Sequence, residues 1–143
     1  MNKTLIILVI IGLVLAWKFV LFPQKLDFTD KMKVLHGLTL ARGYQDAITR
    51  YWQEKQHFPD ARQWQDDVPA VAVDLARSIV GSIRVAEQSP GSITLYYSNT
   101  RDSALAPAIS GRSLTLTPYL QDGVLLWSCQ GNVPAEFLPK HCH

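Results

Sequence analysis

Apolar residues are distributed unevenly along this chain, and the densest run is the stretch 5–22. Fourteen of its residues are Leu, Ile, Val or Phe, and Pro23 follows directly. A helix over this stretch would be about 27 Å long, close to the ~30 Å hydrocarbon thickness of a bilayer. Its aliphatic side chains favour insertion by several kcal/mol, whereas Lys18 opposes it by at most about 3 kcal/mol because it lies near one end. The pattern predicts a membrane-spanning helix.

We expect this helix to provide both anchoring and association with partners. The residues expected to carry these roles are Leu5, Leu8, Ile11, Leu15, Phe19, Phe22 and Pro23. Two other interpretations stay open: a cleaved secretory signal with a cleavage triplet at 14–16, and a buried core helix. One lysine precedes the run, whereas Lys18 near its far end and three lysines after it lie on the other side, so charge counting argues against a cytoplasmic N-terminus.

After Pro23, apolar residues recur every three or four positions, which is typical of an amphipathic helix with one apolar stripe. We therefore predict a helix over 24–56, bent at Pro23. Gly37 and Gly43 should weaken it by about 1 kcal/mol each relative to Ala. Polar residues that include Asp30 and Arg42 fall mainly off the stripe. The predicted stripe is Phe28, Met32, Leu35, Leu38, Ala41, Tyr44, Ile48 and Tyr51.

The pattern changes to strands in the second half of the chain. A connecting segment over 57–80, with room for a short helix, precedes a predicted sheet over 81–129. Short alternating or β-branched runs separated by turn residues predict strands at 82–86, 92–98, 113–120 and 124–129. Short turns favour an antiparallel meander, and the helix stripe can cover its apolar face. The fold class is α+β.

Two details of the strands carry separate expectations. Pro118 cannot donate to a β-ladder, so it suits a strand end or an edge. Tyr96 and Tyr97 are adjacent in one strand, so their side chains must point to opposite faces and one of them should be in the core.

The composition is that of an ordinary globular protein, with 143 residues, 18% charged residues and a net charge of +2. This charge is too small to imply a nucleic-acid partner by itself. The two cysteines, Cys129 and Cys142, favour a disulfide in an oxidising compartment over two buried thiols. Such a bond would close a loop of about a dozen residues and stabilise the fold by roughly 3 kcal/mol.

We find no motif that indicates catalysis. The sequence has no phosphate-binding loop, no dinucleotide fingerprint, no C-x-x-C and no G-x-S-x-G. The terminal His141-Cys142-His143 could hold a metal, but Cys142 is better explained by the disulfide and the remaining site is incomplete. We therefore expect no enzyme activity, no cofactor, no metal and no small-molecule substrate.

The order of these features resembles the type IV pilins and their relatives in type II secretion. The resemblance covers nearly the whole chain and rests on the spacing of its motifs together. The motifs that carry the resemblance are the apolar helix with Pro23-Gln24 at its membrane exit, Tyr51-Trp52 before Phe58-Pro59, the segment 109–118, Trp127-Ser128-Cys129, and a closing Leu138-Pro139-x-x-Cys142.

The resemblance implies a ladle shape, with a stem over 1–23, a head over 24–143 and a disulfide-bounded loop over 129–142. It also implies a single-pass protein of the bacterial inner membrane, with its N-terminus cytoplasmic and its head periplasmic or in a surface filament. The implied partners are other pilin subunits and inner-membrane assembly proteins, with a role in adhesion, motility or DNA uptake. A non-polymerising, membrane-anchored binding or regulatory protein is the alternative.

Some pilin-like proteins bind DNA through a basic face, so the resemblance also allows a nucleic-acid partner. The candidate cations of the head are interspersed with acidic residues, which favours a mixed solvated surface over a DNA site. These cations are Arg62, Arg77, Arg84, Arg101, Arg112 and Lys140.

Two features differ from the usual pilin pattern. Prepilins carry a short basic leader ending in glycine, whereas here Met1 to Thr4 lead into the apolar run and the first glycine is Gly12. Pilins also have an early glutamate, thought to pair with a neighbouring N-terminal amine, but this chain has no acidic residue before Asp27. The sequence predicts either a relative that does not polymerise by the usual route or a true start other than Met1.

Overall fold

The computed structural model of the protein describes residues 11, 25–76, 78–98, 107–140 and 142. Its described helices and strands, in chain order, are α2 (Lys25–Lys55), α3 (Ala61–Asp67), β1 (Val80–Val85), β2 (Ile93–Tyr97), β3 (Ser113–Gln121), β4 (Val124–Gly131) and the 3-10 turn η1 (Ala135–Phe137).

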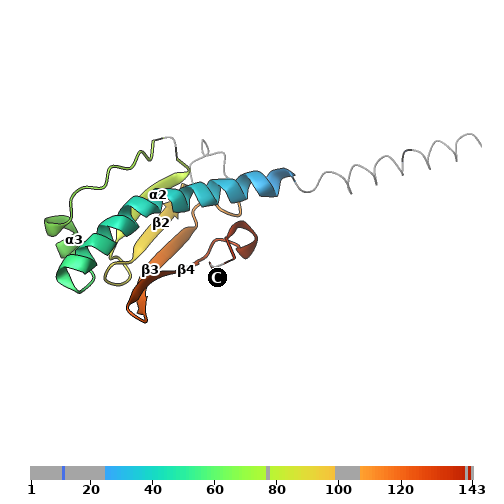
Figure 1. Ribbon diagram of the computed structural model, residues 1–143. Helices are drawn as coiled ribbons and strands as arrows, with labels where there is room; N and C mark the ends of the chain where they lie inside the picture. The colour runs from blue at the N-terminus through green and yellow to red at the C-terminus, as the bar shows by residue number, and fades with distance from the viewer. Residues whose placement is uncertain (1–10, 12–24, 77, 99–106, 141, 143) are drawn as a thin grey trace, which may run out of the picture.

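The four strands form one antiparallel sheet in the order β1-β2-β3-β4, and α2 lies across one face of it (Figure 1). This arrangement confirms the predicted α+β fold with a long helix on a four-stranded meander. The expected helix over 24–56 corresponds to α2, and the expected short helix in the connecting segment corresponds to α3.

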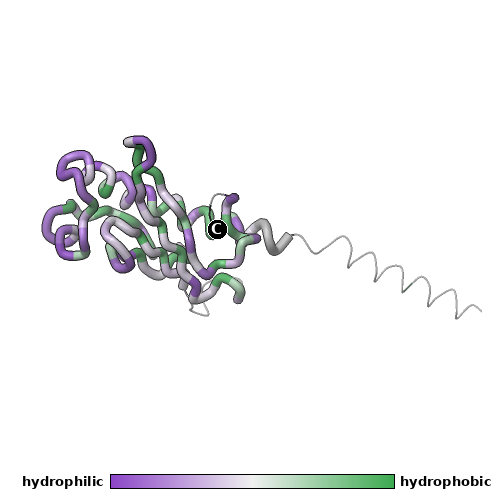
Figure 2. The backbone as a smooth tube through the Cα atoms, turned by 90° about the horizontal axis from the view of Figure 1, so that it is seen from below, coloured by the Kyte–Doolittle hydropathy of each residue, from purple (hydrophilic) through white to green (hydrophobic). Residues whose placement is uncertain are grey.

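Alternation along the strands places the core between the sheet and α2. Leu114 and Leu116 of β3 are buried, and they pair across the ladder with Leu95 and Ile93 of β2, which are fully buried. Cross-strand partners share one face of a sheet, so these four side chains form the apolar layer under the helix. Hydrophilic residues gather at the end of the molecule that carries α3 (Figure 2).

The helix stripe differs from the predicted one at its beginning. Met32 was expected in the stripe but is 50% exposed, whereas Asp30 was expected off the stripe but is 6% exposed and bonded to Lys33 at 3.0 Å. The prediction missed Val34, which is fully buried. Residues spaced three and four positions apart form two alternative lines along this part of the helix, one through Met32 and one through Val34, and we call each line a track. The track through Val34 and Gly37 is the one that faces the sheet, because it brings the helix backbone closest to β1 and β2.

Pro118 lies inside β3, but at a point where β3 is an edge of the sheet. β2 pairs with β3 only as far as Leu116, while β4 continues alongside β3 to Gln121. The half of β3 that contains Pro118 therefore has a strand partner on one side only. This explains how a proline fits in a strand that is internal over its first half.

The connecting segment begins with a well-capped α3. The Asp60 side chain accepts a hydrogen bond from the Gln63 amide at 2.8 Å, and the Gln63 side chain accepts one from the Asp60 amide at 3.1 Å. This reciprocal capping box satisfies two donors that a helix start leaves unpaired. It allows a helix of only seven residues to form at this end of the head.

Within the described residues, no helix combines the length and the apolar character needed to cross a bilayer. The predicted membrane helix lies outside the described residues except for Ile11, as do Pro23 and most of the loop predicted for 100–111.

Candidate functional site

Ile11 is the one predicted assembly residue that the structure describes, and it is 49% exposed. The others, Leu5, Leu8, Leu15, Phe19, Phe22 and Pro23, lie outside the described residues. The candidate sites that the structure describes therefore lie on the head. They are a groove with a mostly apolar lining and a projecting hairpin with exposed apolar side chains.

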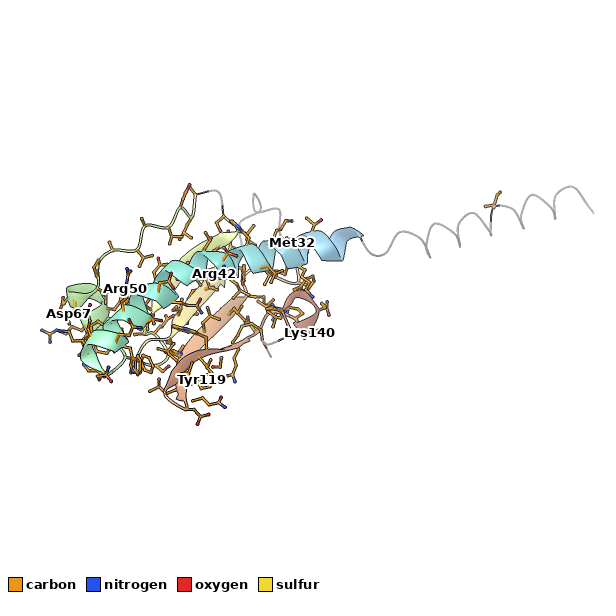
Figure 3. The ribbon with its side chains drawn as sticks, in the orientation of Figure 1. Met32, Arg42, Arg50, Asp67, Tyr119 and Lys140 are labelled. Carbon is orange, nitrogen blue, oxygen red and sulfur yellow. A yellow bond between two sulfur atoms is a disulfide. The ribbon has the colours of Figure 1, made fainter. Side chains whose placement is uncertain are left out.

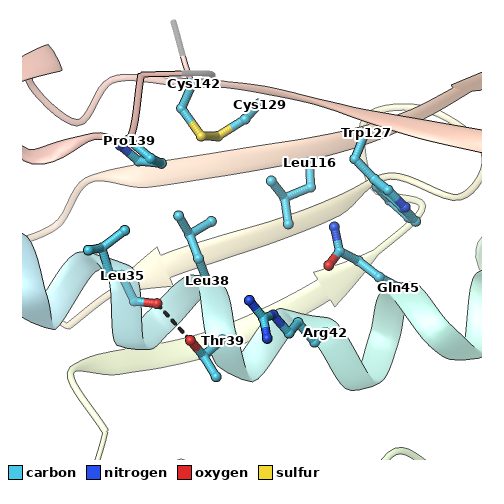
Figure 4. A pocket seen from close by; sticks show the side chains of 10 residues that line it. All are labelled: Leu35, Leu38, Thr39, Arg42, Gln45, Leu116, Trp127, Cys129, Pro139 and Cys142. Atoms are coloured by element: carbon cyan, nitrogen blue, oxygen red, sulfur yellow. Dashed lines mark hydrogen bonds between the residues drawn. A yellow bond between two sulfur atoms is a disulfide. The ribbon is translucent and has the colours of Figure 1, made fainter.

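The groove runs between α2 and the layer formed by β3, β4 and the C-terminal segment. Its volume is about 420 Å³. Figure 4 shows Leu35 and Leu38 of α2 facing Pro139 and the disulfide across it. The lining residues are Leu35, Leu38, Thr39, Arg42, Gln45, Leu116, Trp127, Cys129, Pro139 and Cys142.

The groove has an apolar floor and a polar rim. Leu116 is buried at its base and Trp127 is half-buried at one end. Arg42 alone among the lining residues carries a charge; it is exposed and makes no ion pair with a described residue. The groove can therefore accept a few apolar side chains next to a carboxylate.

A disulfide between Cys129 and Cys142 forms one wall of the groove. The two cysteines are 13 residues apart and nearly buried, at 5% and 2% exposure. Between them, Phe137 and Leu138 are buried in the core, and η1 packs against α2. The bond thus holds the C-terminal segment over the helix.

The β3–β4 hairpin extends past the end of β2 (Figure 1) and carries apolar side chains into solvent. Tyr119, Leu120, Val124 and Leu126 are 42%, 48%, 57% and 36% exposed. Asp122, at the turn, is also exposed and has a φ of 52°. Figure 3 shows Tyr119 at the far end of this hairpin. The sequence pattern predicts the turn but not the exposed apolar tip, although apolar residues flank the turn on both sides.

Arg84, Glu87 and Tyr96 form a polar cluster on the sheet near β1. The Tyr96 hydroxyl donates to Glu87 Oε2, and Arg84 Nη1 donates to Glu87 Oε1 at 2.9 Å. The Arg84 guanidinium carbon, Cζ, lies 5.3 Å from the centroid of the Tyr96 ring. The hydrogen bond from Tyr96, with support from Arg84, lowers the pKa of Glu87 below its ordinary value. The same hydrogen bond raises the pKa of Tyr96.

Tyr97 points the opposite way, into the core, where it is 3% exposed. Burial raises the pKa of its phenol well above the ordinary value. This confirms the expectation that one of the two adjacent tyrosines is a core residue.

The candidate basic residues do not converge where the structure describes them. Arg62 lies 3.6 Å from Asp66 and Arg84 is paired with Glu87, so both are next to carboxylates. Arg112 and Lys140 are exposed. Arg77, Arg101, His141 and His143 lie outside the described residues, and the described part of the chain holds no cluster of three metal-ligating side chains.

Comparison with known proteins identifies relatives of this chain. A fimbrial protein, EcpC, of Eikenella corrodens is 24% identical over 141 residues, covering 98% of this chain and 86% of the relative. The type IV major pilin PilE of Neisseria gonorrhoeae is 26% identical over 128 residues, covering 89% and 70%. A fimbrial protein of Neisseria meningitidis is 26% identical over 127 residues, covering 89% and 68%.

The model of the pilin family, described as a bacterial filament protein, matches residues 31–143. This region contains most of α2, the whole sheet and the disulfide-bonded segment. The order of these elements agrees with the family match, and the chain belongs to the pilin family.

Proposed function

We propose that this protein is a structural subunit or accessory protein of a type IV pilus or related machinery and assembles through its N-terminal helix. Membership of the pilin family carries this proposal. The apolar run 5–22 leads into α2 in the sequence, and α2 supports the sheet of the head. An association surface on this run would therefore hold each head beside the heads of other pilin subunits.

We also propose that the chain is anchored in the bacterial inner membrane, with a cytoplasmic N-terminus and a periplasmic head. The hydrophobicity of the run 5–22 supports insertion. The disulfide between Cys129 and Cys142 supports an oxidising compartment for the head. Inner-membrane assembly proteins are then the partners that would move the chain into a filament.

The experiment introduces charge into the apolar run of the full chain. Leu8→Glu combined with Leu15→Glu should remove the protein from both the membrane fraction and the sheared filament fraction, because carboxylates are costly in the bilayer core. Met32→Glu is the matched control, since Met32 is half exposed on the head and should tolerate a charge. A doubly substituted chain that still enters membranes and filaments would contradict the proposal.

A second candidate is a membrane-anchored binding protein with a pilin-like head that does not polymerise. It is favoured by the lack of acidic residues in the apolar run, because an early glutamate gives pilin helices an assembly register. Shearing filaments from cells and probing both fractions for the unmodified chain separates the two candidates. A chain found in membranes but never in filaments favours the second. Adhesion, motility and DNA uptake of a deletion strain then decide among the finer roles.

A further inference from the structure

We propose that the tip of the β3–β4 hairpin of one copy docks in the groove beside Arg42 of a second copy. This inference rests on the proposed function, because assembly supplies the neighbouring copy. It specifies which two surfaces of the heads meet.

The hairpin tip has the character of a docking element. Its apolar residues project on both faces: Leu120 lies on the face of the sheet that α2 covers, while Tyr119 and Leu126 are cross-strand partners on the opposite face. Beyond the end of β2, these side chains have no strand beside them on the β2 side. Contiguous exposed apolar side chains on a polar-rimmed protein usually mark an interaction surface.

The groove has the complementary character. Its lining by leucine side chains, Trp127 and the disulfide is mostly apolar, and its volume of about 420 Å³ suits a few side chains of a narrow element. A two-residue turn between two strands is such an element. Docking would bury apolar surface on both partners, which is the main favourable term in association.

Charge fixes the orientation of this contact. Asp122 is the acidic residue at the tip of the hairpin, and Arg42 is the cation at the rim of the groove (Figure 4). Neither makes an ion pair with a described residue of its own chain. Seating the apolar tip on the groove floor brings the Asp122 carboxylate to the Arg42 guanidinium. Opposite charges placed this way favour one register and suppress others.

The two surfaces are different, so the contact is heterologous. A copy whose hairpin is docked still offers its groove to a third copy, and such a contact propagates if the rotation between copies does not close a ring. The same contact therefore repeats along an open assembly, with one free hairpin at one end and one free groove at the other.

A zero-length carbodiimide cross-link tests the contact in cells that make the full chain. Arg42→Lys supplies an amine that can be joined to the Asp122 carboxylate of a neighbour. We expect a ladder of dimers and larger species, with a cross-linked peptide joining position 42 to Asp122. Arg42→Lys combined with Asp122→Asn is the control and should give no ladder. A ladder that stops at the dimer would overturn the head-to-tail contact in favour of a reciprocal pair.

The ladder is measured in membranes and in sheared filaments, so the two proposals fail separately. Filaments without the position 42–Asp122 peptide overturn this contact and leave the proposed function intact. The peptide in membranes without any filaments supports the contact and contradicts the proposed function. Neither peptide nor filaments contradicts both.

Charge reversal gives an independent check on the wild-type pair. Arg42→Asp or Asp122→Arg alone should reduce the yield of assembled protein at least about threefold. Each substitution removes one exposed ion pair and places two like charges opposite each other. The double reversal should restore the yield. Arg50→Asp is the matched control, because Arg50 is exposed on the same helix but does not line the groove (Figure 3). Equal loss for Arg50→Asp, or no rescue by the double reversal, overturns the proposal.

Discussion

The Tyr97 hydroxyl on β2 donates a hydrogen bond to the backbone carbonyl oxygen of Val34 on α2, at 3.3 Å. Both residues are buried, so this bond joins the helix to the sheet inside the core. The close approach depends on Gly37. A β-carbon there would lie 3.0 Å from Val80 Cγ2 and 3.1 Å from the Tyr97 hydroxyl oxygen. Helix propensity alone predicts a weak point at Gly37, whereas the structure shows a close packing contact there.

We predict that Gly37→Ala destabilises the head by up to about 2 kcal/mol. Alanine has the better helix propensity by about 1 kcal/mol, but overpacking a close-packed core typically costs about 1–3 kcal/mol. Here the neighbours are two buried side chains, Val80 and Tyr97, which have little room to move. Denaturant unfolding of the full chain in detergent, followed by tyrosine and tryptophan fluorescence, measures the change.

Gly43→Ala is the matched control on the same helix. Its β-carbon would meet one atom, Val71 Cγ1, at 3.0 Å, and Val71 belongs to the connecting segment and is half-buried. Because that side chain can yield, we expect a gain of up to about 1 kcal/mol from helix propensity. Equal losses for the two substitutions would show that Gly37 has no special packing role.

Tyr97 should make the head sensitive to alkaline pH. Its pKa is raised by burial, so the folded state keeps the phenol neutral where the unfolded chain, with a pKa of about 10, ionises. The contribution of the Tyr97 phenol to the free energy of unfolding is therefore fully present below about pH 10, and it is lost as the pH rises towards the raised pKa. Tyr97→Phe should reduce the slope of stability against pH above pH 10, at the cost of about 1 kcal/mol or less for the lost hydrogen bond at neutral pH. Unfolding free energies measured at pH 7 and pH 10.5 for both forms test this, and an unchanged alkaline slope would contradict it.

The sheet could be predicted from the sequence because its signals are local. Turn residues and alternation mark each strand, and in a meander successive strands pair with their neighbours, so order follows from the chain. The track of the helix stripe was harder to predict. The track through Met32 and the track through Val34 have similar periodicity, and the choice between them depends on the close contact at Gly37 with Val80 and Tyr97 from distant parts of the chain.

The candidate docking surfaces could not be predicted for a related reason. The groove joins Leu38 of α2 to Trp127 of β4 and Pro139 near the C-terminus, so it exists only once the three segments are packed. The exposed tip depends on where β2 stops pairing, at Leu116, and a residue pattern in β3 alone does not mark that position.

Removing the disulfide should weaken the head without abolishing its fold. We expect Cys129→Ala with Cys142→Ala to lower the free energy of unfolding by roughly 3 kcal/mol, since the bond closes a short loop in the unfolded chain. The wild-type protein in reductant should show the same loss. Alkylation of the native protein without reduction should modify neither cysteine, and quantitative labelling of both would contradict the disulfide.

The pKa of Glu87 should rise when the Tyr96 hydroxyl is removed. Because the Tyr96 hydroxyl donates to its carboxylate, the pKa of Glu87 is lowered in the folded state, and this interaction stabilises the head above the unfolded-state pKa. The stabilisation is lost as the pH falls through the lowered folded-state pKa. Tyr96→Phe should raise the pKa of Glu87 towards its ordinary value, as followed by NMR of the side-chain carboxyl carbon between pH 2 and pH 7. Tyr119→Phe, on the hairpin away from this cluster, is the control. A Glu87 titration that is the same in wild type and in Tyr96→Phe would show that Arg84 alone holds the carboxylate ionised.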